Sequence, residues 1–214
     1  MTAAVPAAAG TAAVLVAAVL YAEKAGRPVL RAVAKAGASA VFVAVGFLRW
    51  RAGDPYGSWI VAGLLLGAAG DLLLALPRGF AAGLAVFLLG HAAYVAAFAA
   101  VVPFAAWPPA ALLPVLLVSG VAVRYLWPHL GRLRPAVLVY VAVITVMVWG
   151  AAAALNAGPE GWRRLAGAAL FYLSDLFVAR NRFVRQRFSN RAIGLPLYYA
   201  GQLLLAFTVG CGPV

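Results

Sequence analysis

Residues 135–155 read PAVLVYVAVITVMVWGAAAAL and contain no charged side chain. A helix that crosses a membrane needs about 20 consecutive apolar residues, because the hydrocarbon layer is about 30 Å thick. This stretch is therefore long enough and apolar enough to span a bilayer, and other stretches of the same kind follow one another along the whole chain.

We predict an all-α protein, a polytopic membrane bundle of about eight transmembrane helices. Glycine and proline mark the breaks between the apolar stretches, as at Gly26-Arg27-Pro28, Gly53-Asp54-Pro55 and Gly158-Pro159. No loop is long enough to form a soluble domain, so we expect one integral membrane domain over residues 1–214. The predicted helices are 3–21, 30–48, 58–76, 80–101, 109–126, 135–155, 162–180 and 192–210.

Composition excludes a soluble protein of this size. The chain is 66% hydrophobic and 10% charged, whereas soluble domains carry about 25% charged residues. The net charge of +12 comes from basic residues between apolar stretches, which indicates contact with anionic lipid rather than nucleic acid. Residues 1–21 lack a basic leading segment, so we interpret them as a first transmembrane helix rather than a cleaved leader. Cys211 is the one cysteine, so no intramolecular disulfide is expected.

The basic residues also predict the orientation in the membrane, because cytoplasmic loops carry an excess of Lys and Arg. The side that holds both termini has Arg49, Arg51, Arg163 and Arg164. The other side has Lys24, Arg27, Arg31, Lys35, Arg78, Arg124, Arg132, Arg134, Arg180, Arg182, Arg185, Arg187 and Arg191. We therefore expect a cell-membrane protein, in a bacterial cytoplasmic membrane, with both termini outside.

Two aspartates lie within predicted transmembrane helices, where a charged group is costly and indicates function. Asp71 and Asp175 both lie near the cytoplasmic end of their helices, at about the same depth. Taken singly, a buried aspartate can simply bond a neighbouring helix, a histidine can be packed in the core, and tyrosines can be interfacial. Further polar residues reach the same level, however, and together they predict a polar pocket in the cytoplasmic half: Lys35, His91, Tyr94, Ser174, Asn181, Tyr198, Tyr199 and Gln202.

A short internal repeat surrounds the two aspartates. Asp71-Leu-Leu-Leu-Ala75 corresponds to Asp175-Leu-Phe-Val-Ala179, 104 residues further on. The following helix carries Gly90-His91 in the first copy and Gly201-Gln202 in the second. Because four predicted helices separate the copies, they share one orientation, which indicates a parallel four-plus-four repeat with the pocket between its halves.

At these residues the chain resembles the YhhN family, which includes the transmembrane lysoplasmalogenases. The resemblance covers nearly the whole chain, although Lys35-Ala36 stands where the family has a lysine-proline pair. It places the family's two intramembrane aspartates on Asp71 and Asp175 and its histidine on His91. The segments that carry it are GDLLLAL (70–76), FLLGHAAY (87–94), LFYLSDLFVARNRF (170–183) and YYAGQLLLAF (198–207).

The resemblance implies hydrolysis of the vinyl ether bond of a lysoplasmalogen, a lysophospholipid substrate, to a fatty aldehyde and a glycerophospho head group. That chemistry needs one protonated acid, one ionised carboxylate and a positioned water, and two aspartates in an apolar site can supply the acid and the carboxylate. The sequence does not assign the two roles. His91 or Tyr94 could orient water or relay a proton, and cytoplasmic arginines could hold the phosphate.

Other classes of protein remain open alternatives. A small proton-coupled transporter also uses intramembrane acids and repeats, and a hydrolase of another lipid bond would need similar groups. A catalytic zinc site needs about three protein ligands, but the chain has two histidines, His91 and His129. Ser174 lacks the G-x-S-x-G context of a serine hydrolase. We therefore expect no metal and no cofactor.

Overall fold

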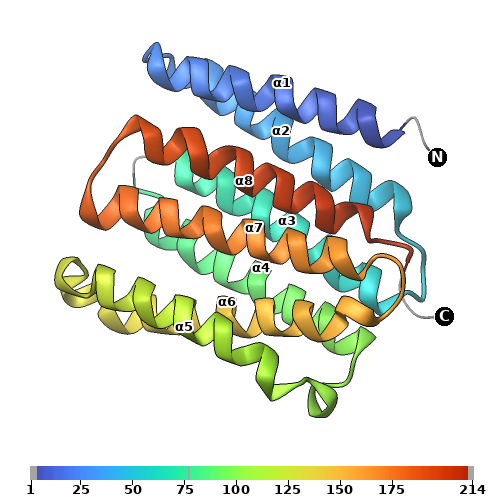
Figure 1. Cartoon of the computed structure of the whole chain (residues 1–214). Coiled ribbons are helices and arrows are strands. Elements are labelled where there is room, and N and C mark those ends of the chain that lie inside the picture. Colours follow the sequence, from blue (N-terminus) through green and yellow to red (C-terminus); the bar gives the residue numbers. More distant parts are fainter. Residues whose placement is uncertain (1–3, 77, 212–214) are drawn as a thin grey trace.

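The computed structural model describes residues 4–76 and 78–211 (Figure 1). Eight long helices form the described chain, with short 3₁₀ turns between some of them, and no strand occurs within these two ranges. A π-helical turn, η5 (Arg180–Val184), follows α7. The helices are α1 (Ala4–Lys24), α2 (Pro28–Arg49), α3 (Pro55–Ala75), α4 (Phe80–Val101), α5 (Pro109–Leu126), α6 (Arg134–Ala153), α7 (Gly161–Ala179) and α8 (Phe188–Phe207).

The prediction of eight helices is confirmed, and α4 and α5 have the predicted bounds. Three helices begin at a proline, at Pro28, Pro55 and Pro109, because proline at the first helical position presets φ and lacks an N–H that would have no partner there. The largest difference is at α8, which begins at Phe188 rather than at residue 192. Residue 3, the predicted start of the first helix, lies outside the described residues.

The chain is a multi-pass membrane protein. Six helices, α1 to α6, are long and apolar enough to cross a membrane by length and composition. The remaining two, α7 and α8, carry more polar residues and pack against each other within the bundle. Large apolar side chains cover the outside of the molecule, among them Val29 and Leu48, which are 75% and 87% exposed. Such a surface suits lipid as its solvent.

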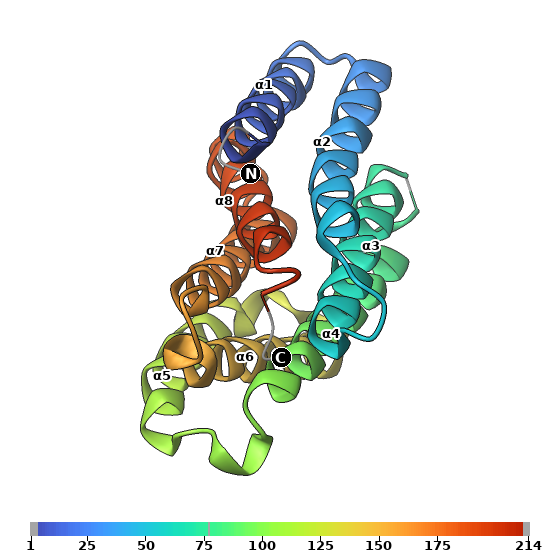
Figure 2. The same cartoon turned by 90° about the vertical axis from the view of Figure 1, so that its right-hand side faces the viewer.

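The arrangement of the helices supports the parallel repeat. Seen along the helices in Figure 2, α3 and α4 lie opposite α7 and α8, with α1 and α2 at one end and α5 and α6 at the other. The second helix of each half packs on the fourth helix of the other half, since α2 contacts α8 and α6 contacts α4. The contact between α2 and α8 is therefore equivalent to the contact between α6 and α4, and the two contacts join the halves on opposite sides.

Glycine contacts follow the same repeat. In the first half, a Cβ atom added to Gly90 would lie 3.5 Å from the carbonyl oxygen of Gly63. In the second half, a Cβ atom added to Gly201 would lie 2.8 Å from the carbonyl oxygen of Gly167. Gly63 and Gly167 are 104 residues apart, the offset that separates the two aspartates. Small residues let the backbones of α3 with α4, and of α7 with α8, approach closely, so both aspartates are carried by equivalent, tightly packed hairpins.

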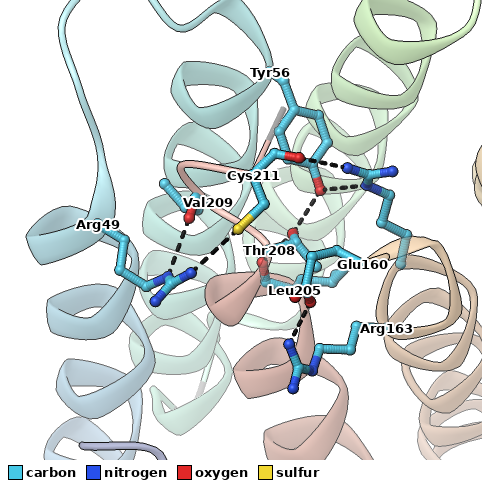
Figure 3. Close-up of polar contacts among 9 residues, drawn as sticks. Arg49, Tyr56, Glu160, Arg163, Leu205, Thr208, Val209 and Cys211 are labelled. Carbon is cyan, nitrogen blue, oxygen red and sulfur yellow. Dashed lines mark hydrogen bonds and ion pairs between the residues drawn. The ribbon is translucent and has the colours of Figure 1, made fainter. Parts of the chain in front are cut away.

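α1 begins and α8 ends at the same end of the bundle (Figure 1). There, polar side chains hold the residues that follow α8 (Figure 3). Arg49 donates to the carbonyl oxygen of Val209 at 3.1 Å, and the hydroxyls of Tyr56 and Thr208 lie 2.5 Å apart. The buried guanidinium of Arg164 donates to Tyr56 Oη and to the carbonyl oxygens of Ala157 and Cys211. These contacts satisfy backbone carbonyls of residues that follow the helices, and none of these residues lines the two cavities described below.

Candidate active site

A cavity of about 560 Å³ lies at the opposite end of the bundle, between the two halves. Residues of α1 to α4 line it from the first half, and residues of α6, α7, η5 and α8 line it from the second. Asp71 and Asp175 both belong to its wall. Each lies four residues before the end of its helix, at Ala75 in α3 and at Ala179 in α7. The structure thus brings the two aspartates to one cavity at matched depth.

Asp71 is held by three donors from two helices. Lys35 Nζ of α2 lies 3.0 Å from Asp71 Oδ1. Ser39 Oγ, one turn further along α2, donates to Asp71 Oδ2 at 2.6 Å, and the hydroxyl of Tyr199 in α8 donates to the same oxygen at 3.3 Å. The residue is only 3% exposed. Because a buried carboxylate needs a paired charge and hydrogen bonds to remain ionised, this environment is suited to a permanent carboxylate.

Asp175 has a different set of partners, from α4 and α6. The hydroxyl of Tyr140 donates to Asp175 Oδ2 at 2.7 Å, and His91 Nε2 lies 3.0 Å from the same oxygen. No Lys or Arg side chain of the described residues is ion-paired with Asp175. Its side chain is 17% exposed, and its second oxygen, Oδ1, accepts no hydrogen bond from any described residue. This oxygen is therefore available to a bound molecule.

His91 is completely buried, and its surroundings define the role of its two nitrogens. Nε2 lies near both Asp175 and Tyr140, whereas Nδ1 has no hydrogen-bond partner among the described residues. We assign the proton of the neutral ring to Nε2, which lies within hydrogen-bond distance of Asp175. A proton on Nδ1 would be a buried N–H without an acceptor, which costs more free energy. The ring of Phe171 packs on His91 at a centroid distance of 4.4 Å and fixes its orientation.

Three of the expected polar residues form a separate chain of hydrogen bonds. The hydroxyl of Tyr94 donates to Gln202 Oε1 at 2.6 Å, and Gln202 Nε2 donates to the hydroxyl of Tyr198 at 3.3 Å. Tyr198 lines the cavity, but Tyr94 and Gln202 lie behind it. The hydroxyl of Tyr94 therefore points to α8 and contacts neither aspartate.

Ser174 and Asn181 line the cavity, but their side chains make local contacts. The hydroxyl of Ser174 donates to the carbonyl oxygen of Phe171 one turn earlier in α7. Asn181 Oδ1 accepts from the backbone N–H of Arg187 and so stabilises the loop before α8. Both residues shape the wall of the cavity.

Two residues in contact with the aspartates, Tyr140 and Ser39, were not among the sequence candidates. The signal for Tyr140 lay in the apolar stretch 135–155, where a hydroxyl group interrupts a run of aliphatic residues. Ser39 lies one turn after Lys35, in a small-residue segment of α2. Neither hydroxyl can be recognised as part of the site until the helix that lies beside it is known.

Charged side chains surround the mouth of the cavity. Glu23, at the end of α1, pairs with Arg31 of α2 at 3.0 Å and also with Arg191 of α8. Arg182 and Arg185 also line the cavity and have no acidic partner among the described residues; the guanidinium of Arg182 lies over the ring of Phe80 at 4.3 Å. The mouth therefore keeps two positive charges available for an anionic group.

The described residues contain no group of three or more His, Cys, Asp or Glu side chains that could hold a metal ion. His129 lies in an exposed turn after α5, away from the cavity. The groups around the cavity are those of acid–base chemistry: two carboxylates, a histidine, hydroxyls and a lysine.

Comparisons with known proteins agree on one family. The YhhN family matches residues 30–209. A lysoplasmalogenase of Mycobacterium tuberculosis is 33% identical over 150 residues, which cover 66% of this chain and 55% of that protein. Lysoplasmalogenase TMEM86A of Bos taurus is 36% identical over 165 residues, 72% of this chain and 66% of that protein.

The human lysoplasmalogenase TMEM86B is 32% identical over 163 residues, 74% of this chain and 66% of that protein. The chain thus spans between about half and two thirds of the length of these relatives. No solved structure matches it significantly. With a family match that includes α3, α4, α7 and α8 and both aspartates of the cavity, the chain belongs to the YhhN family.

Proposed function

We propose that this chain is a lysoplasmalogenase, a membrane hydrolase that cleaves the vinyl ether bond of lysoplasmalogens. The products would be a fatty aldehyde and a glycerophospho head group. The observation that carries the proposal is the pair Asp71 and Asp175, which line one cavity with different partners. Membership of the YhhN family and relatives named lysoplasmalogenase support it.

Asp175 is the proposed proton donor. A protonated carboxyl group carries its hydrogen on one oxygen and accepts on the other. Tyr140 and His91 both contact Oδ2, so the proton belongs on Oδ1, the oxygen that accepts no hydrogen bond from a described residue. Once the proton has left, the same two neighbours hydrogen-bond the carboxylate and stabilise it.

Asp71 is the proposed permanent carboxylate. An ionised carboxylate has about four lone-pair sites, and three donors, Lys35, Ser39 and Tyr199, contact it. One acceptor site remains for a water molecule. The ammonium group of Lys35 is the counter-ion of Asp71, and a carboxylate at this place can position water and accept a proton from it.

The reaction then proceeds in three balanced steps. The electron pair of the alkene takes the proton of Asp175 and forms a C–H bond at the carbon farther from the ether oxygen, which leaves an oxocarbenium ion. Water adds to the charged carbon and gives a proton to Asp71. The hemiacetal collapses: its hydroxyl proton returns to Asp175, the C–O bond to glycerol breaks, and Asp71 protonates the departing oxygen. Water is consumed, and both aspartates regain their starting states.

The mouth of the cavity suits the phosphate of the head group. Arg182 and Arg185 lie on the cavity wall, and guanidinium groups bind phosphate through paired, charge-assisted hydrogen bonds. We place this mouth on the cytoplasmic side of a bacterial cytoplasmic membrane, since the loops at that end carry most of the basic residues. The substrate would reach it from the cytoplasmic leaflet.

Purified full-length protein in detergent tests the proposal. It is incubated separately with a lysoplasmalogen, with the matched alkyl ether lysolipid that lacks the double bond, and with the acyl lysophospholipid. Aldehyde from the vinyl ether alone is the expected result, because only an alkene can accept the proton. Release of fatty acid from the acyl lipid would indicate an esterase instead. No product from any of the three would contradict the proposal and favour a transporter.

A further inference from the structure

A second, narrow cavity of about 60 Å³ lies beside the large one. It runs between α4, α5, α6 and α7, and we call it the side slot. Its lining is almost entirely apolar, in contrast to the arginine-rich mouth of the large cavity. Residues that face it include Leu84, Ala122, Leu126, Val137, Ile144 and Leu176.

The side slot and the large cavity share part of their walls. Asp175 and Tyr140 line both, together with Phe80, Leu84, Val178 and Phe183. Asp71 and Lys35 line the large cavity alone. The Asp175–Tyr140 pair therefore stands at the boundary between a polar space and an apolar one.

We propose that the side slot binds the aliphatic chain of the lysolipid substrate. This rests on the proposed function, because a lysoplasmalogen has the same division: its vinyl ether joins a polar glycerophospho group to a long apolar chain. With the head group at the arginines and the chain in the side slot, the vinyl ether lies beside Asp175. The alkene carbon that receives the proton is the one on the chain side, which Asp175 borders and Asp71 does not.

The dimensions of the side slot suit part of a chain. Its wall on α6 extends from Val137 to Ile144, a distance of about 10 Å at about 1.5 Å per residue. Val178 of α7, which lines both cavities, is 41% exposed, so the side slot is open at this residue and the rest of a longer chain can continue beyond it. Lipid and detergent are as apolar as the side slot, so a chain that moves from them into the slot gains little from the hydrophobic effect. The side slot therefore selects chains by shape.

Ala122→Phe tests the proposal by filling the side slot with a larger side chain. Val121→Phe, one residue earlier in α5 and 62% exposed to the outside, is the matched control. We compare kcat/KM for lysoplasmalogens with long and very short alkenyl chains. Ala122→Phe is expected to lower the long-to-short ratio at least ten-fold, whereas Val121→Phe leaves it unchanged. A folded Ala122→Phe variant with the wild-type ratio would overturn the proposal.

A second measurement does not depend on turnover or on the folding of that variant. The probe is an alkyl ether lysophospholipid, which has no double bond to cleave, with a diazirine in the middle of its chain. After illumination with wild-type protein, mass spectrometry should find the label on side-slot residues of α5, α6 or α7, with competition by unlabelled lysolipid. Label confined to outward-facing residues would overturn the chain site. Labelling of the side slot without any vinyl ether cleavage would instead remove the proposed activity and leave the chain site standing.

Discussion

Lys35 Nζ lies 3.0 Å from Asp71 Oδ1, in an ion pair whose side chains are 15% and 3% exposed. The equivalent helix of the second half, α6, offers the hydroxyl of Tyr140 to Asp175 instead of an ammonium group. The two halves thus carry the same acid in different electrostatic surroundings. This difference is the basis for assigning the ionised role to Asp71 and the proton-donating role to Asp175.

Replacing Lys35 with methionine should destabilise the protein. Asp71 would become a buried carboxylate without a counter-ion, and removing one partner of a buried pair costs about 3–5 kcal/mol. The free energy of unfolding in detergent measures this cost. Lys24→Met, at an exposed position, should leave it unchanged. The double variant Lys35→Met with Asp71→Asn should recover stability without activity. A Lys35→Met protein as stable as the wild type would show that the pair is not formed.

Asp71→Asn and Asp175→Asn should each abolish turnover in a protein that still folds. An amide cannot deliver the proton to carbon, and it cannot accept one from water. Activity toward lysoplasmalogen and thermal unfolding are measured on the same preparations. Near-normal activity in either variant would exclude the two-carboxylate mechanism.

The Tyr140–His91 pair should contribute less than the acids themselves. His91→Ala is expected to lower kcat by about 10² to 10⁴-fold, the range of a single acid–base group. Tyr140→Phe removes a single hydroxyl and should cost less than His91→Ala. The matched control is Tyr94→Phe, since the hydroxyl of Tyr94 contacts Gln202 and neither aspartate. An equal loss of kcat in the Tyr94→Phe and Tyr140→Phe variants would show that the contact of Tyr140 with Asp175 does not contribute to catalysis.

Most of the fold could be predicted from hydropathy, because lipid demands long apolar helices and the chain marks their ends with proline and glycine. The start of α8 could not. Ser189, Asn190 and Arg191 look like loop residues, but they form the first turn of the helix. Asn190 Nδ2 donates to the carbonyl oxygen of Arg185, and this contact across the preceding loop supports the early start.

The aspartates and their depth could be predicted because charge inside a membrane is rare. Their partners were harder to find. The hydroxyls of Ser39 and Tyr140 occur in helices that are otherwise apolar, and neither residue is unusual there. The partner of Tyr94 could not be predicted either, because spacing along one helix shows which side chains share a face, but not which neighbouring helix that face meets. The side slot depends on the packing of four helices and leaves no local pattern.

Topology provides a prediction that is independent of catalysis. Both termini should lie outside the cytoplasm, because the loops at the cavity end carry most of the basic residues. Alkaline phosphatase fused to the C-terminus should therefore be active in cells. The matched control is a fusion after Arg78, in the loop between α3 and α4, which should be inactive. The reverse pattern would place the mouth of the cavity on the outer side of the membrane.

Heavy water tests the bond-breaking step itself. If Asp175 protonates the vinyl ether, one solvent hydrogen goes to carbon, at the position next to the new aldehyde. Turnover in heavy water should therefore leave one deuterium there, in a C–D bond that exchanges only slowly. A solvent isotope effect should accompany it, since proton transfer to carbon is the difficult step.

The aldehyde is trapped quickly as a stable derivative and analysed by mass spectrometry. Unlabelled aldehyde kept in heavy water with Asp175→Asn protein measures background exchange. An esterase or amidase would place solvent hydrogen on oxygen or nitrogen alone. Aldehyde without deuterium at that carbon would exclude protonation by Asp175, even for an enzyme that cleaves the vinyl ether bond.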